Sequence, residues 1–239
     1  MGKKLQKVGT GVLWAVGGTI SATLAAAVGW ILYSRKYVRH DLELDEALAA
    51  DRKDFESEHV GRLSYYIDAE GSGIPLVLLH SINAAPSAFE MKPIFERFKG
   101  ERPVYALELP GFGFSERSDR IYNPLLYQRA ITSFLEEVVR QPADVVALSL
   151  SCEFAALSAA HDPENIRSLV MISPTGFSPP RTDKLPERAR QREAKDTLYS
   201  GLSVGFWNRP FYDLVSSRPS IRFFLNESFE GLLPEPFVD

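Results

Sequence analysis

One stretch of 17 residues, Asp144–Ala160, does most to limit the folds open to this chain: DVVALSLSCEFAALSAA. Four consecutive apolar residues, Val145–Leu148, are typical of a parallel strand that is buried on both faces. From Cys152 onward the apolar residues recur at helical spacing. A buried strand that passes into a helix within a few residues is typical of sheets whose strands alternate with helices. We therefore expect an α/β fold.

The rest of the chain repeats this alternation. Strands are expected at Arg62–Asp68, Ile74–His80, Pro103–Leu109 and Ile166–Ser173, and helices at Ala88–Phe98 and Leu125–Gln141. Pro93 must lie near the start of its helix or kink it. Residues 35–60 are charge-rich and predict a short amphipathic helix or a linker. The pattern predicts a mostly parallel sheet with helices on both faces.

Two serines, Ser149 and Ser151, lie where the strand turns into the helix. A nucleophile on such a sharp turn needs small residues two before and two after it. Ser149 has Ala147 and Ser151 at these positions, whereas Ser151 has the bulky Glu153 on one side. The spacing favours Ser149 as a nucleophile beside a helix N-terminus, whose N–H groups favour developing negative charge. The alternative is that Ser149 only caps the helix.

The single cysteine and the charge balance narrow the chemistry further. One cysteine excludes an intramolecular disulfide framework. Cys152 is either a reactive thiol or a small buried residue, and the second interpretation is favoured because buried free cysteines are usually inert. A formal net charge of -4 gives no reason to expect a nucleic-acid partner.

The N-terminal segment has a different character. No charged residue occurs between Val8 and Ser34. A helix of this length would exceed the roughly 30 Å hydrocarbon core of a bilayer. Basic residues flank the run, and the cluster after it is typical of an uncleaved anchor rather than a signal peptide: Lys3, Lys4 and Lys7 before it, and Arg35, Lys36 and Arg39 after it. The sequence predicts a single N-terminal transmembrane helix with the lipid bilayer as a partner.

Two further expectations concern this helix. Small residues recur every four positions, at Gly17, Ser21, Ala25 and Gly29. This stripe either contacts a partner helix or only reflects the many small residues of the run. Flanking charges are balanced, and basic residues further along favour the cytoplasmic side for the domain that follows. The expected location is a single-pass membrane protein.

From about Arg62 to Gly176 the chain resembles the α/β-hydrolase family. Four motifs occur in the family's order: LLHSIN after the third strand, ELPGFGFSERS after the fourth, ALSLS at the elbow, and LVMISPTGF at the sixth strand. The resemblance implies a mostly parallel α/β-hydrolase sheet, incomplete and ending at the sixth strand, with a helical lid segment. The implied domains are an anchor (1–34), a juxtamembrane linker (35–60), a hydrolase core (61–176) and a partial lid (177–239).

The resemblance also implies roles for individual residues. Ser149 would be the nucleophile, and the N–H groups of Leu150 and Ile82 would form the oxyanion hole. His80 would brace its loop. A serine nucleophile implies acyl transfer to water from an ester, thioester, amide or lactone, with a small acyl substrate, no organic cofactor and no metal. The aromatic pieces of the lid either line an apolar acyl pocket or pack the lid onto the core.

The chain departs from the family pattern in several places. Ser81 stands where glycine is usual and Glu108 where aspartate is common, while Ser151 and Cys152 replace glycines of the elbow. These changes put the geometry of the oxyanion hole in doubt.

A histidine base is also missing from its family position. The family order is Ser, then Asp or Glu, then His, but the four histidines are His40, His59, His80 and His161. We favour the interpretation of a truncated form, or one part, of a membrane-anchored serine hydrolase, weakly active or inactive alone. The alternatives are a non-catalytic, membrane-anchored binding or scaffold protein on a hydrolase fold, and a hydrolase whose base is unusual or comes from another chain.

Overall fold

The computed structural model describes residues 25–41, 43–83, 85–175 and 204–228. The chain divides into two compact units. Residues 43–180 form the first, called here the sheet unit, and residues 1–42 together with 181–239 form the second.

The sheet unit contains a six-stranded mixed sheet with the strand order β1-β2-β4-β3-β5-β6. Strands β3, β4, β5 and β6 run parallel to one another, whereas β1 and β2 pair antiparallel with each other and β2 pairs antiparallel with β4. The strands are β1 (Asp51–Ser57), β2 (Gly61–Asp68), β3 (Leu76–Leu79), β4 (Val104–Leu107), β5 (Ala143–Leu148) and β6 (Ile166–Ile172). This architecture confirms the α/β class.

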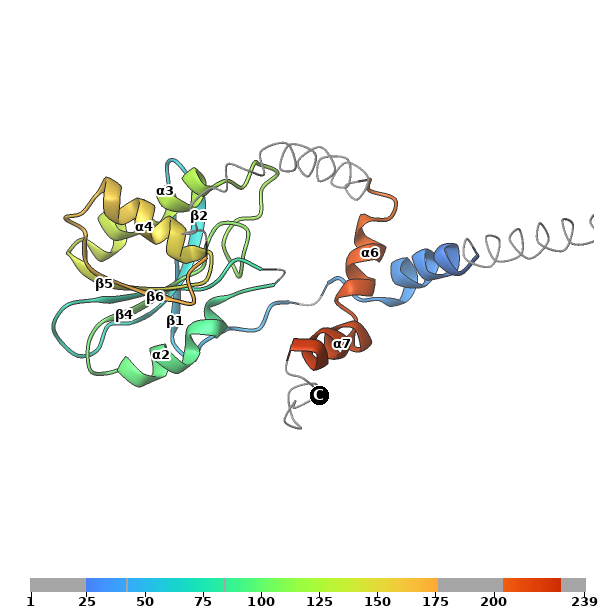
Figure 1. Cartoon of the computed structure of the whole chain (residues 1–239), viewed down its shortest axis with the longest axis horizontal. Coiled ribbons are helices and arrows are strands. Elements are labelled where there is room, and N and C mark those ends of the chain that lie inside the picture. Colours follow the sequence, from blue (N-terminus) through green and yellow to red (C-terminus); the bar gives the residue numbers. More distant parts are fainter. Residues whose placement is uncertain (1–24, 42, 84, 176–203, 229–239) are drawn as a thin grey trace, which may run out of the picture. The chain divides into compact units, whose positions relative to one another are not determined.

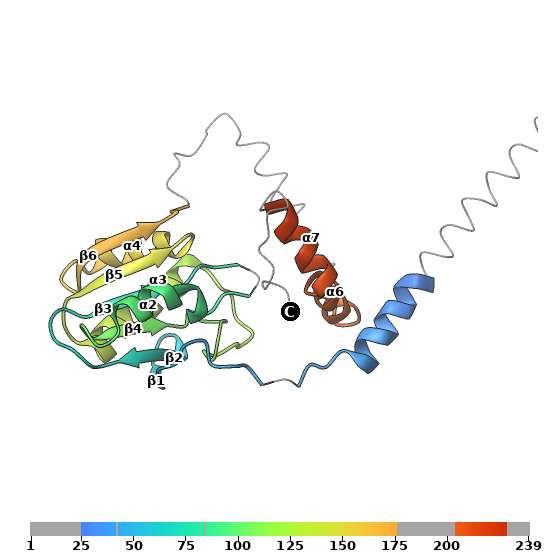
Figure 2. The same ribbon diagram turned by 90° about the horizontal axis from the view of Figure 1, so that it is seen from below.

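Helices cover both faces of the sheet (Figures 1 and 2). Helices α3 (Pro124–Phe134) and α4 (Ser151–His161) pack on one face, and the 3-10 turn η1 (Ala88–Met91) with α2 (Lys92–Phe98) packs on the other. A π-helical turn, η2 (Leu135–Val139), extends α3. Pro93 lies in the first turn of α2, where a proline costs no hydrogen bond.

Strand β3 shows how the sequence builds two cores at once. Its four residues are all buried, and successive side chains point to opposite faces. Val77 and Leu79 join the core under α3 and α4, while Leu76 and Leu78 join the core under η1 and α2. The continuous apolar run therefore reflects burial on both faces.

Strand β1 replaces the helix or linker that the sequence predicts over these residues. It is mostly polar, yet it pairs with β2 along its whole length, from Asp51↔Ile67 to Ser57↔Gly61. Its aromatic side chain, Phe55, packs against Phe134, with 5.7 Å between the ring centroids. Backbone pairing and the contacts of Phe55 with Phe134 and Tyr65 hold an edge strand that periodicity does not reveal.

The predicted transmembrane helix is wrong as far as the structure describes it. Residues 25–37 are helical. Among the described residues, no helix combines the length and apolarity needed to cross a membrane. Residues 8–24 of the predicted run, with Gly17 and Ser21, lie outside the described residues. The bilayer as a partner, the stripe of small residues as a helix contact and the cytoplasmic orientation of the following domain stay predictions.

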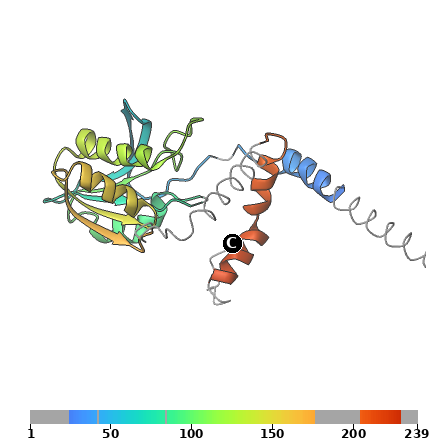
Figure 3. The same ribbon diagram turned by 45° about the horizontal axis from the view of Figure 1, so that its top comes forward.

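The second unit consists, in its described part, of the helix at residues 25–37 together with α6 (Asn208–Val215) and α7 (Arg218–Ser228). Figure 3 shows the first of these helices, in blue, beside α6. Trp30 Nε1 donates to the Pro210 carbonyl oxygen at 2.7 Å. The buried carboxylate of Asp213 accepts from Ser34 Oγ and lies 3.0 Å from His40 Nε2. The other residues of the expected lid, 177–203 and 229–239, lie outside the described residues.

Candidate active site

The candidate site lies at the C-terminal ends of β3 and β5, two neighbouring parallel strands. Leu79 of β3 is the register partner of Ala147 of β5. Ile82 and Leu150 each follow three residues after this pair. Ligands bind at this end of the strands in open α/β sheets. The topology therefore brings the oxyanion-loop candidate and the elbow candidate to one edge.

Ser149 occupies the turn between β5 and α4 in a left-handed backbone conformation, with φ at 57°. Such a conformation is uncommon for a residue other than glycine and costs about 1–3 kcal/mol. The Ser149 N–H donates to the Ile172 carbonyl oxygen of β6 at 2.9 Å, which holds the turn in place. Ser149 itself is only partly buried. The backbone is thus bent so that this hydroxyl stays accessible.

Ser151 has a different environment from Ser149. It is fully buried as the first residue of α4, and its Oγ donates to the His80 carbonyl oxygen at 2.5 Å. Cys152 is also fully buried, with its Sγ 3.2 Å from the Ala147 carbonyl oxygen. Burial raises the pKa of the Cys152 thiol. Of the two serines, Ser149 is therefore the one that a substrate can reach.

The two oxyanion candidates, the N–H groups of Leu150 and Ile82, follow the neighbouring ends of β5 and β3. Leu150 is the N-cap residue of α4, so its N–H belongs to the helix end whose donors have no partner within the helix. Ile82 lies in the loop after β3 and, like Leu150, is partly buried against the core. Among the described residues, neither N–H donates to an acceptor.

His80 is fully buried directly after β3, and both of its ring nitrogens are engaged by backbone groups. Nε2 lies 3.0 Å from the Leu109 N–H, and Nδ1 lies 2.6 Å from the Ser81 carbonyl oxygen. An amide N–H can only donate and a carbonyl oxygen can only accept, so Nδ1 carries the proton and the ring is neutral. Burial lowers the pKa of His80 to about 4. The ring holds two loops and has no free nitrogen for a proton transfer.

Two further histidines of the sheet unit lie away from Ser149. His161 is the last residue of α4, roughly 15 Å along that helix from its start at 1.5 Å per residue. His59 is exposed in the turn between β1 and β2. The fourth histidine, His40, belongs to the second unit. The sheet unit therefore supplies no histidine that contacts the Ser149 hydroxyl.

The loop after β4 is closed around the buried side chain of Glu108. Its Oε2 accepts from the Phe114 N–H at 2.6 Å, and burial raises its pKa. Oε1 has no partner among the described residues. A Cβ at Gly113, where φ is +51°, would lie 2.0 Å from this carboxyl group. The glycine is required by both its backbone conformation and the close approach of Glu108.

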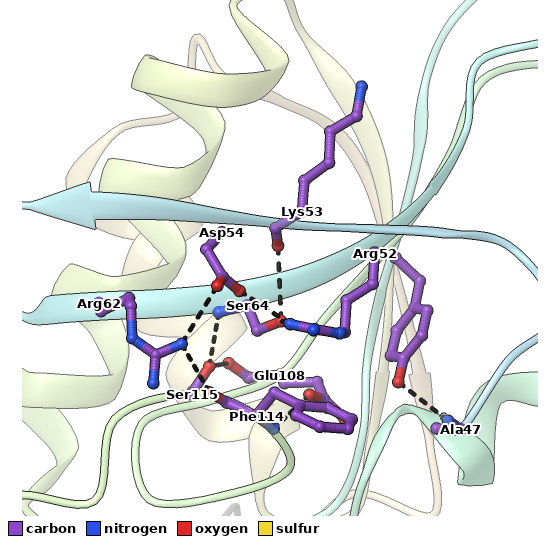
Figure 4. Close-up of polar contacts among 10 residues, drawn as sticks. Ala47, Arg52, Lys53, Asp54, Arg62, Ser64, Glu108, Phe114 and Ser115 are labelled. Atoms are coloured by element: carbon purple, nitrogen blue, oxygen red, sulfur yellow. Dashed lines mark hydrogen bonds and ion pairs between the residues drawn. The ribbon is translucent and has the colours of Figure 1, made fainter. Parts of the chain in front are cut away.

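Strands β1 and β2 hold the outer side of the same loop (Figure 4). The Arg52 guanidinium lies over the Phe114 ring, 4.2 Å from its centroid. Ser115 Oγ accepts from the Ser64 N–H at 2.8 Å and donates to the Glu108 carbonyl oxygen at 2.5 Å. Sequence reasoning missed Arg52, because it lies in the segment that was expected to be a linker.

Glu90 and Asn83 are the other residues that the sequence did not single out. The Glu90 carboxylate accepts from the Ser81 N–H at 2.8 Å and from Ser81 Oγ at 2.9 Å. Asn83 Nδ2 donates to the same carboxylate at 2.9 Å. One sequence signal for such a partner was available: Ser81 stands where glycine is usual, and its added hydroxyl needs a hydrogen-bond partner.

Among the described residues, no group of three or more His, Cys, Asp or Glu side chains could hold a metal ion.

A mixed α/β sheet with a strained serine turn between a strand and a helix is the arrangement expected of an alpha/beta hydrolase, and sequence comparison agrees with this class. Residues 76–236 match the model of the alpha/beta hydrolase family. The chain belongs to this family.

Curated relatives of the chain are hydrolases. It is 28% identical over 175 residues to the 2-hydroxymuconate semialdehyde hydrolase of Pseudomonas sp. (strain CF600), covering 70% of this chain and 61% of that protein. It is 26% identical over 118 residues to the 2-(acetamidomethylene)succinate hydrolase of Mesorhizobium japonicum (strain LMG 29417 / CECT 9101 / MAFF 303099), covering 49% of this chain and 42% of the relative. The chain thus spans 61% or less of the length of these two relatives.

A solved structure, that of a membrane phospholipase A, superposes with a TM-score of 0.51 at 21% identity, over 79% of this chain and 55% of that one. This likeness shows the shared fold alone.

Proposed function

We propose that the sheet unit carries the nucleophile and the oxyanion hole of a serine hydrolase that transfers a small acyl group from an ester, thioester, amide or lactone to water. The observation that carries this proposal is the conformation of Ser149. Its φ of 57° between β5 and α4 places a reachable hydroxyl where parallel strands end. A mere helix cap has an extended backbone and does not need this strain.

The chemistry assigned to each group is simple. Ser149 Oγ attacks the acyl carbon, and its proton leaves to a base. The carbonyl oxygen becomes an oxyanion, which the N–H groups of Leu150 and Ile82 stabilise. Collapse of the tetrahedral intermediate expels the alcohol, thiol or amine and leaves an acyl-enzyme. Water then attacks this ester, releasing the acid and restoring the hydroxyl.

The missing part of this scheme within the sheet unit is the base. A serine hydroxyl stays protonated at neutral pH unless a neighbouring base accepts its proton. An oxyanion hole with substrate binding alone leaves roughly 10³–10⁴-fold catalysis over water. We therefore expect slow turnover by this chain alone. The engagement of both His80 nitrogens favours, as a second candidate, a non-catalytic protein that binds acyl compounds at the same place.

Covalent labelling separates the two candidates. The 239-residue chain is incubated for hours with a fluorophosphonate, and the adduct is located by mass spectrometry. We expect slow labelling of Ser149 that is lost in Ser149→Ala and kept in Ser72→Ala, which changes an exposed serine of the turn before β3. Added imidazole, a substitute base, should accelerate labelling of the wild type above the Ser149→Ala background.

Absence of any adduct at Ser149, with and without imidazole, would refute the hydrolase proposal and leave the binding protein. An adduct at Ser151 would show that the elbow is in the other register.

A further inference from the structure

The oxyanion loop has an unusual form of support on both sides of its proposed donor. Ile82 supplies this donor, and its neighbours in sequence, Ser81 and Asn83, both donate to the carboxylate of Glu90. Asn83 Nδ2 also donates to Ser81 Oγ at 2.7 Å. Three donors from two residues therefore converge on one side chain, which comes from η1.

The contacts to Glu90 fix the direction of the loop as well as its position. The Ser81 N–H donates to Oε2, so this N–H cannot serve the oxyanion. Ser81 Oγ and Asn83 Nδ2 donate to Oε1, the other carboxylate oxygen. Hydrogen bonds to a charged acceptor are short and about twice as strong as neutral ones. The peptide group between the two anchored residues has little freedom left, and it carries the Ile82 N–H.

The strand side of the loop is anchored separately. Ser151 Oγ donates to the His80 carbonyl oxygen, and the His80 ring donates to the Ser81 carbonyl oxygen. Ser81 and Ser151 are two of the positions where the chain departs from the family's usual glycine. Each added hydroxyl makes a hydrogen bond at this loop, so the departures that cast doubt on the oxyanion geometry instead hold it.

We propose that Glu90 is a positioning residue, which keeps the Ile82 N–H aimed at the oxyanion through Ser81 and Asn83. This inference rests on the proposed function. Glu90 does not contact the reacting atoms in the scheme above. Loss of one oxyanion donor typically lowers the rate 10²–10³-fold, and a donor that is loosened rather than removed should lower it less.

The test compares Glu90→Ala, Glu90→Gln and a matched control, Glu96→Ala, which removes an exposed carboxylate from α2 in the same layer. Glutamine keeps one acceptor oxygen, but its amide nitrogen then faces Asn83 Nδ2. The rate constant of imidazole-assisted fluorophosphonate labelling of Ser149 is measured for each protein. Amide hydrogen exchange of residues 81–83 and the thermal midpoint are measured on the same samples.

We expect Glu90→Ala to lower the labelling rate constant roughly 10-fold or more and to accelerate exchange at residues 81–83, with a similar thermal midpoint. Glu90→Gln should recover part of both, and Glu96→Ala should match the wild type. A lower labelling rate constant at an unchanged thermal midpoint distinguishes a positioning role of Glu90 from a general contribution to stability.

Two results would overturn the assignment, and they differ in what they imply for the proposed function. Labelling that depends on Ser149 but is equal in wild type and Glu90→Ala removes the positioning role alone. Equal fluorophosphonate labelling of the wild type and Ser149→Ala refutes the hydrolase proposal and the positioning role together. If Glu90→Ala does not fold, the test rests on Glu90→Gln. A Ser149 labelling rate constant equal to that of the wild type, together with unchanged exchange at residues 81–83, would then contradict the proposal.

Discussion

His80 should make the stability of the sheet unit depend on pH in a range where most carboxylates do not titrate. Burial lowers its pKa from 6.5 to about 4, although the hydrogen bond to Ser81 and the charge of Glu90 act in the opposite direction. A group with a lower pKa in the folded state binds fewer protons when folded. Its stabilising contribution is complete above pH 6.5 and is lost as the pH falls toward 4.

The magnitude follows from the two pKa values. Between pH 7 and pH 5 the unfolded histidine becomes protonated while His80 stays neutral, which costs about 2 kcal/mol of unfolding free energy. The structural reason is that a proton on Nε2 would expel the Leu109 N–H from its acceptor. Urea titrations at several pH values measure this change.

The assay should use far-UV circular dichroism. The three tryptophans, Trp14, Trp30 and Trp207, all lie outside residues 43–180, so their fluorescence reports on the second unit. His80→Gln can donate to the Ser81 carbonyl oxygen and accept from the Leu109 N–H without titrating. It should lose the 2 kcal/mol dependence, whereas the exposed-site control His59→Gln should keep it. Equal pH dependence in wild type and His80→Gln would refute the argument.

Three further predictions test the same unit. Gly113→Ala should destabilise the unit by at least about 1–2 kcal/mol, because of the left-handed backbone and the overlap of the new methyl group with Glu108. Urea midpoints should show a smaller loss of stability for the control Gly73→Ala, where φ is +112° but no atom lies within 4 Å. Glu108→Gln should stabilise the unit increasingly as the pH rises above 4.5. Burial raises the Glu108 pKa, so the folded wild type holds a proton that the unfolded state releases. If urea titrations show a stability difference between Glu108→Gln and the wild type that does not vary with pH, the argument is wrong. Cys152 should resist a thiol reagent until urea unfolds the protein, and fast reaction in the native state would show that the elbow opens.

The sequence predicted those parts of the fold that repeat a local pattern. The apolar runs of β3 and β5 and the strand-to-helix turn at Ser149 have short-range signatures, and the structure contains all three. Strand β1 has no such signature. Its residues are mainly polar, and the strand exists because β2 provides a pairing partner and because Phe134 and Tyr65 contact the Phe55 ring. Long-range pairing of this kind cannot be read from periodicity.

The candidate site was predictable to a similar extent. Spacing distinguished Ser149 from Ser151, and the structure separates the two by burial and by the Ser151 hydrogen bond. Glu90 was not predictable, because it meets Ser81 only through the packing of η1 beside the end of β3. The transmembrane prediction rested on the length of an uncharged run and on its basic flanks, and among the described residues no helix is long and apolar enough to cross a membrane.

The two separate cores described for the sheet have a consequence for the lifetime of the oxyanion geometry. One support of the loop, Glu90, comes from the layer that packs on Leu76 and Leu78, and the other, Ser151, comes from the layer that packs on Val77 and Leu79. A fluctuation that lifts one layer leaves the other support in contact with the loop. Loss of one layer should therefore loosen Ile82, and its orientation should be lost completely only when both layers leave the sheet.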